Sequence, residues 1–159
     1  MAEIRDVAWR VDPPPSGRAR VAHYVLAVLV ASVLGAIVQT QFNLARLSAL
    51  GVPIPLRERI DTTLFDLGSF GPTLAAITAI TFLLALPVAG LLARRLPRLR
   101  GALFFAAGVV GIWVAFRIVD ALVPPPTLIG ATRGVFGLLS MMGAAGAGSW
   151  LFSRHGRRR

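Results

Sequence analysis

Charged side chains interrupt apolar sequence in the last third of this chain, and they are its strongest candidates for a chemical site. Arg117 and Asp120 lie three residues apart, a spacing that places both on one face of a helix. Arg133 follows after three prolines, which force a short extended connection. Trp113 lies four residues before Arg117, where its ring can stack under the guanidinium. We therefore expect Arg117, Asp120, Arg133 and Trp113 to form one ligand-contacting cluster.

Asp120 neutralises only one of the two arginines of this cluster, so one positive charge remains. The sequence is compatible with three roles for this charge. Asp61 or Asp66 from the preceding polar loop could neutralise the charge and pin the loop. An anionic lipid headgroup or a polar quinone-like ligand could bind there instead. The third use is proton or ion transport, although no acidic residue falls at the middle of an apolar run, where a coupling carboxylate is expected.

The residue types that carry most enzyme chemistry are scarce. The chain has no cysteine, which excludes thiolate nucleophiles, cysteine-ligated zinc and iron–sulfur clusters. Its two histidines, His23 and His155, cannot hold a haem between helices and do not supply a buried base for a serine. No metal-ligand spacing and no phosphate-binding glycine loop occur. We expect a protein without enzymatic activity, cofactor or metal.

The apolar runs determine the fold class. Of the 159 residues 55% are apolar and only 15% charged, and the mean hydropathy is +0.71, far from the values of a soluble domain. Four runs are long enough to cross about 30 Å of hydrocarbon: residues 21–39, 72–93, 101–123 and 129–152. The sequence predicts an all-α protein, a single transmembrane domain of four antiparallel helices.

Arginines between the runs predict the orientation. The net charge of +10 does not form a nucleic-acid patch, because twelve of the seventeen arginines are divided among the tail 1–20, the turn between the second and third runs, and the tail 153–159. All three segments fall on one side of a chain that crosses four times. Since cytoplasmic loops are rich in basic residues, we expect both termini in the cytoplasm of a bacterial cell, with the protein in the inner membrane. Anionic lipid headgroups are expected at Arg94, Arg95, Arg98 and Arg100.

The loop 40–71 is too polar to span a membrane and too apolar to be a free linker. A short helix from Phe42 to Leu50 is expected to end at Gly51. After Pro53 and Pro55, apolar residues at helical spacing predict an amphipathic helix that lies flat on the outer membrane face or covers the bundle like a lid. The amides of Gln39, Gln41 and Asn43 satisfy the helix end and the turn behind it, or bind a headgroup.

Small residues predict where the helices pack, because close backbone approach drives helix association in lipid. Gly130 and Gly134 form a G-x-x-x-G pair that Gly137 continues, and Gly108 and Gly111 lie in the third run. We expect the third and fourth runs to pack on each other, or to offer a surface to another membrane protein. The leading prediction of function is an accessory or assembly subunit of a membrane complex, and the alternative is binding or transport of the lipid-like or quinone-like ligand.

Overall fold

The computed structural model describes residues 17–122 and 129–155, except for the side chain of His155. The N-terminal tail through Ser16, the three prolines Pro124–Pro126 and the last four residues lie outside this part of the chain. Five α-helices follow in order, with two short 3₁₀ turns: α1 Gly17–Ala49, α2 Leu56–Ser69, α3 Gly71–Arg95, η1 Pro97–Leu99, α4 Arg100–Leu122, η2 Gly130–Arg133 and α5 Val135–His155.

Four of the helices, α1, α3, α4 and α5, are long and apolar enough to cross a membrane. Much of their surface is apolar and exposed, as at Leu83, Leu84 and Leu91, each more than 60% exposed. Water disfavours such a surface, whereas lipid tails solvate it. The predicted all-α fold with four spans is confirmed, and it is the architecture of a multi-pass membrane protein.

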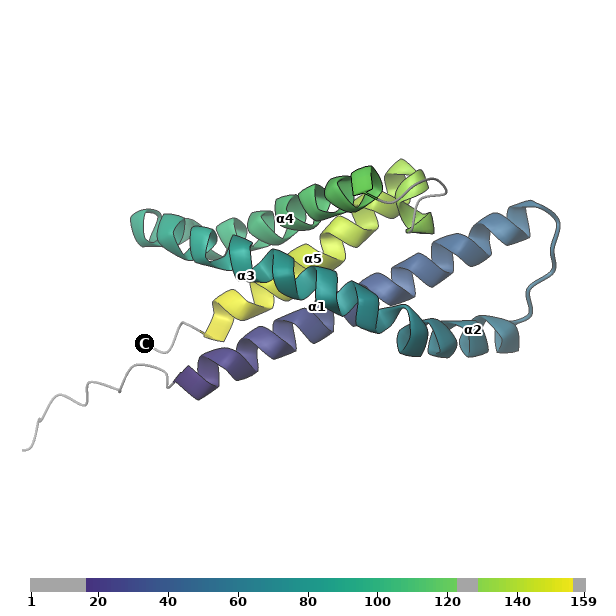
Figure 1. Ribbon diagram of the computed structural model, residues 1–159, viewed down its shortest axis with the longest axis horizontal. Coiled ribbons are helices and arrows are strands. Elements are labelled where there is room, and N and C mark those ends of the chain that lie inside the picture. The colour runs from purple at the N-terminus through teal and green to yellow at the C-terminus, as the bar shows by residue number, and fades with distance from the viewer. Residues whose placement is uncertain (1–16, 123–128, 156–159) are drawn as a thin grey trace, which may run out of the picture.

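The spans form a ring in which each helix contacts two neighbours. Helix α5 packs between α1 and α4, and α3 packs on α4 and α1 (Figure 1). The largest side chains that this ring buries completely are Phe82, Phe116, Leu74 and Ile112. The termini of the described chain lie at the same end of the bundle, as an even number of crossings requires.

Small residues make the closest helix contacts. A Cβ atom on Gly108 of α4 would lie 2.6 Å from the Ala145 carbonyl oxygen of α5. On the other side of α5, a Cβ atom on Gly148 would lie 2.6 Å from the Ala27 carbonyl oxygen of α1. A Cβ atom on Gly111 of α4 would lie 2.8 Å from the Thr81 side-chain methyl group of α3. The expected packing of the third span on the fourth is present at Gly108, whereas Gly111 faces the second span, α3.

Helix α1 differs from the prediction, because it continues to Ala49 where a break near residue 40 was expected. Residues 40–49 contain neither glycine nor proline, so nothing stops the helix from propagating, and the buried Thr40 and Leu44 pack it onto its neighbours. The predicted stop at Gly51 is confirmed: this glycine has a φ of +85°, which side-chain-bearing residues rarely adopt.

The start of the fourth span also differs from the prediction. Residues Gly130–Arg133 form the 3₁₀ turn η2, Gly134 is extended, and α5 begins only at Val135. Gly130 and Gly134 therefore do not share a helix, and their expected role as a helix-packing pair is wrong. They instead allow close approach of Asn43 and Arg46, respectively, while Gly137 lets η2 fold back against the first turn of α5.

The amphipathic helix is present as α2, although it does not cover the ends of all the spans. It runs back beside the last turns of α1 and leads directly into α3, and these two helices are its main contacts (Figure 1). None of its residues is buried, and Leu56, Ile60, Leu64 and Phe65 are all more than half exposed. Its position is that of a hairpin arm on α1 and not that of a lid over the bundle.

Candidate functional site

Charge is distributed unequally between the two ends of the bundle. We call the basic end the one where α1 and α4 begin and α3 and α5 end, and it carries seven described arginines: Arg18, Arg20, Arg94, Arg95, Arg98, Arg100 and Arg154. The described acidic residues all lie at the opposite end: Glu58, Asp61, Asp66 and Asp120. Within the described chain, the basic end therefore has no carboxylate to neutralise it.

The cluster expected at the opposite end is not closed by ion pairs. Within the described residues, neither the Arg117 guanidinium nor the Asp120 carboxylate has an ion pair or a side-chain hydrogen bond, although both lie on the last turns of α4. Arg133 is exposed at the end of η2. Trp113 is 43% exposed, and the stacked arginine–aromatic pairs of the described chain are Arg100 on Phe104 and Arg154 on Trp150. Within the described residues, no ion pair, side-chain hydrogen bond or ring contact joins Arg117, Asp120 and Trp113.

The two loop aspartates meet partners other than Arg117 and Arg133. Asp61 forms a 3.8 Å ion pair with Arg57 one turn earlier on α2, and both side chains are largely exposed. Asp66 accepts a 2.7 Å hydrogen bond from the Thr40 hydroxyl of α1. An exposed ion pair of this kind contributes little to stability. The loop is pinned, but through α1.

The polar side chains near the end of the first apolar run hold the neighbouring segments in place. The buried Gln39 side chain accepts a 2.7 Å hydrogen bond from the Ala131 backbone N–H, and Arg46 donates one of 2.6 Å to the Gly130 carbonyl. Gln41 donates to Thr63 of α2 at 3.1 Å. These bonds explain why residues 130–133 form a separate turn. Gln39 and Gln41 do not satisfy a helix end as expected, because α1 continues past them; their side chains instead join α1 to η2 and α2.

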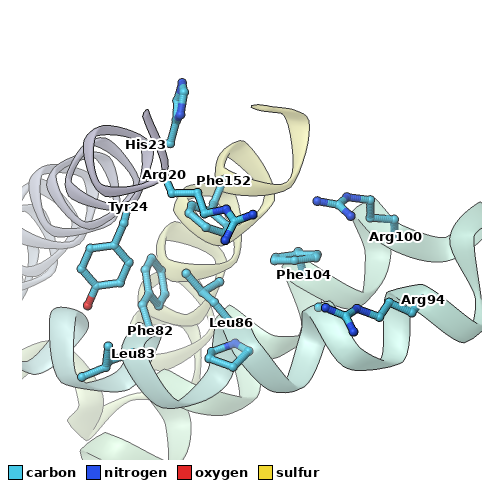
Figure 2. A pocket seen from close by; sticks show the side chains of 12 residues that line it. Arg20, His23, Tyr24, Phe82, Leu83, Leu86, Arg94, Arg100, Phe104 and Phe152 are labelled. Atoms are coloured by element: carbon cyan, nitrogen blue, oxygen red, sulfur yellow. The ribbon is translucent and has the colours of Figure 1, made fainter. Parts of the chain in front are cut away.

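A cavity of about 570 Å³ opens at the basic end, within the size range of small-molecule sites. All four spans contribute to its lining: Arg20, His23 and Tyr24 from α1, Phe82, Leu83, Leu86, Pro87, Gly90 and Arg94 from α3, Arg100 and Phe104 from α4, and Phe152 from α5. Figure 2 shows the guanidinium groups of Arg20, Arg94 and Arg100 directed into this space from different sides, with the Phe104 ring between them. His23 points away from them.

The cavity exists because α1 and α3 separate toward the basic end. The two helices approach each other where the Tyr24 hydroxyl donates a hydrogen bond to the Ala79 carbonyl. Beyond that contact the ribbons of α1 and α3 diverge (Figure 1). The space between them is lined by the completely buried Phe82 and by Arg20, Arg94 and Arg100.

One of the three arginines is held firmly. The Arg100 Nε atom donates a 3.3 Å hydrogen bond to the Ser153 carbonyl, and its guanidinium carbon lies 5.2 Å from the centre of the Phe104 ring. Phe104 in turn packs against Phe152, with ring centres 6.0 Å apart. These contacts leave the terminal nitrogens of Arg100 as donors facing the cavity. Arg100 is therefore preorganised to bind an anion, whereas Arg20 and Arg94 are exposed side chains that can move to meet one.

Pro87 gives the apolar wall one polar group. Proline has no N–H, so the Leu83 carbonyl one turn earlier lacks its usual helical donor, and both residues line the cavity. A ligand hydroxyl below the arginines could satisfy this acceptor. The arrangement can bind and orient an anion with an apolar tail.

The expected lipid contacts at the α3–α4 turn are divided by the structure. Arg94 and Arg100 line the cavity, whereas Arg95 and Arg98 do not. The sequence patterns described above do not single out Arg20, Phe82 or Phe152. A signal existed in the combination of Pro87 and Gly90 near the end of an apolar run that leads into arginines, but this signal did not indicate which helix would face these two residues.

No family model matches the chain, and no curated protein or solved structure is significantly similar to it.

Proposed function

We propose that this protein is a non-enzymatic membrane protein that binds an anionic amphiphile, a molecule with a charged head and an apolar tail, in the cavity at the basic end. The observation that carries the proposal is the convergence of Arg20, Arg94 and Arg100 around one cavity whose apolar floor on α3 is formed by Phe82 and Leu86. Arginine recognises phosphate and carboxylate oxygens in forked geometry, and the apolar floor suits a hydrocarbon chain.

The proposed orientation places this cavity at the cytoplasmic surface of a bacterial inner membrane. Seven described arginines and no described acidic residue lie at the basic end, and the positive-inside rule favours this end in the cytoplasm. An amphiphile of the inner leaflet would then enter with its headgroup among the arginines and its chain toward the bilayer centre. That direction is the one a lipid already has in the membrane.

Filling the cavity tests this function without changing any charge. A Cβ atom on Gly90 would meet only Phe104, at 3.9 Å, so the first carbon of a larger side chain fits. Gly90→Leu is expected to occupy the cavity and to lower the amount of anionic lipid that co-purifies in mild detergent about tenfold, as measured by native mass spectrometry.

The matched control is Gly143→Leu, because no atom lies within 4 Å of a Cβ atom at Gly143. This variant adds the same side chain to a membrane-spanning helix at a position outside the cavity, and it should retain lipid as the wild type does. If folded Gly90→Leu protein retains the same lipid in the same amount, the cavity is not the binding site and the proposal fails.

A second candidate function, the accessory subunit of a membrane complex, is favoured by a different hollow. Gly101, Ala102, Phe105, Ala147 and Trp150 line a shallow space of about 420 Å³ between the first turns of α4 and the last turns of α5. Small residues beside exposed aromatic rings form a seat that a side chain of another transmembrane helix can occupy. In this function the protein would act by contact with a membrane-protein partner.

Ala147→Leu would fill that seat and test the accessory function. We expect gentle extraction of the wild-type protein to recover a partner in stoichiometric amount and the variant to lose most of it, with lipid binding in the arginine-lined cavity unchanged. Recovery of the wild-type protein as a lone monomer would contradict this candidate. Native mass measurement distinguishes the two results.

A further inference from the structure

The arginine-lined cavity carries more positive charge than an ordinary anionic lipid neutralises. Arg20, Arg94 and Arg100 reach it from three different helices. The closest acidic residues in sequence that the structure describes, Glu58 and Asp120, belong to segments at the other end of the bundle. Within the described chain these guanidinium groups therefore have no carboxylate to pair with, and their mutual repulsion favours a counter-anion from outside.

We propose that the headgroup bound here is a phosphate monoester, selected over the singly charged phosphate diester of common anionic lipids. This inference rests on the proposed function, because it specifies the ligand of the same cavity. A phosphate monoester has a charge of about −1.5 to −2 at neutral pH and three terminal oxygens. It can accept forked hydrogen bonds from several guanidinium groups at once, whereas a diester has only two terminal oxygens to offer.

The geometry of the arginines fits a small headgroup. The guanidinium groups converge on one space instead of forming a row along the surface (Figure 2). Arg100 is fixed by its hydrogen bond to Ser153 and its stacking on Phe104, so it defines where the anion sits. The exposed Arg20 and Arg94 can then close on the anion from α1 and α3.

The apolar part of the cavity argues for a lipid and not for a soluble phosphate. The lining residues on α3 extend from Arg94 to Phe82, twelve residues earlier, which is about 18 Å along the helix at about 1.5 Å per residue. Below the arginines it consists mainly of Leu86, Pro87 and Phe82. A free phosphate would leave this surface without a partner, while a hydrocarbon chain would fill it.

Competition between two lipids with identical chains tests the headgroup. The full-length protein is placed in phosphatidylcholine nanodiscs that contain equal amounts of dioleoyl phosphatidic acid, a monoester, and dioleoyl phosphatidylglycerol, a diester. Native mass spectrometry then counts the lipids that stay bound. We expect phosphatidic acid to be retained about fivefold more than phosphatidylglycerol, the factor that corresponds to roughly one additional charge contact.

Variants assign the preference to the cavity. Arg94→Gln and Arg20→Gln each remove one lining charge, and neither side chain has an ion pair within the described chain, so both variants should fold. Each is expected to bring the preference close to equality. Arg98→Gln removes a charge at the same end, outside the cavity, and should leave the preference intact.

Each other outcome overturns a different claim. Equal retention of both anionic lipids over phosphatidylcholine would overturn the monoester assignment and leave the proposed function standing. Retention of neither would overturn both. Glycerol 3-phosphate separates lipid from soluble ligands: if it displaces phosphatidic acid at equal concentration, the site binds a soluble phosphate monoester and the lipid assignment is wrong.

Discussion

Gly108→Leu is expected to lower the free energy of unfolding by about 3 kcal/mol or more, the upper part of the range for overpacking a tight contact. A Cβ atom at this position would lie 2.6 Å from the Ala145 carbonyl oxygen and 2.7 Å from Ser149 Cβ. The first of these belongs to the backbone of α5, so relief of the clash requires the two helices to separate.

Separation of α4 from α5 would lower the stability by more than the loss of the contact at Gly108 alone. The buried Ser149 hydroxyl donates a hydrogen bond to the Phe104 carbonyl across the same interface, one turn from Gly108. Loss of that bond leaves the buried Ser149 hydroxyl without this acceptor in an apolar environment. Gly108 also lies on the helix that presents Arg100 and Phe104 to the cavity, so the variant should lose bound lipid along with stability.

Unfolding by SDS, followed through helicity, measures this effect, and Gly143→Leu is the control. Because nothing lies within 4 Å of a Cβ atom at Gly143, this variant should stay within about 0.5 kcal/mol of the wild type. Equal stability of the two variants would show that α4 and α5 do not approach each other at Gly108.

The second large effect concerns sidedness, and it is all-or-none. The chain contains no cysteine, so a single introduced cysteine is the only thiol that a maleimide can label. Leu50→Cys lies in the exposed turn after α1, and Arg98→Cys lies in η1 at the basic end. In intact bacterial cells, a membrane-impermeant maleimide should label Leu50→Cys and leave Arg98→Cys unlabelled until the membrane is permeabilised.

This prediction follows from the arginines that flank the spans, because their translocation across the membrane is disfavoured. Arg95→Cys, at the end of α3, is the matched control and must behave as Arg98→Cys does. Labelling of Arg98→Cys from outside would invert the protein and place the cavity in the outer leaflet. Labelling of both positions from one side would instead contradict the number of crossings between them.

Arg117 and Arg133 differ from the arginines of the basic end in their surroundings. The sequence singled out these residues because charges inside an apolar run are costly. In the structure Arg117 lies on an exposed part of α4, whereas three arginines of the basic end line the cavity. The free-energy cost of a charged side chain in the bilayer shows that the charge needs an explanation. A binding site requires, in addition, a concave surface around the charge.

The sequence by itself determined the number, approximate limits and relative direction of the spans. Hydropathy and the positions of arginine, glycine and proline are local properties, and they were enough to predict α3, α4 and α2 and the stop at Gly51. They were not enough at η2, because its turn depends on one hydrogen bond that Gln39 accepts and one that Arg46 donates, and both residues lie more than eighty positions away.

The tertiary structure alone decided which basic residues share a site. Arg20, Arg94 and Arg100 come from three helices, and only the approach of α1 to α3 at Tyr24 and Ala79, followed by their separation, brings these arginines around one cavity. The angle between packed helices depends on which small residues meet, as Gly108 and Gly148 do on opposite sides of α5. Such pairings are long-range, so no local pattern in the sequence specifies them.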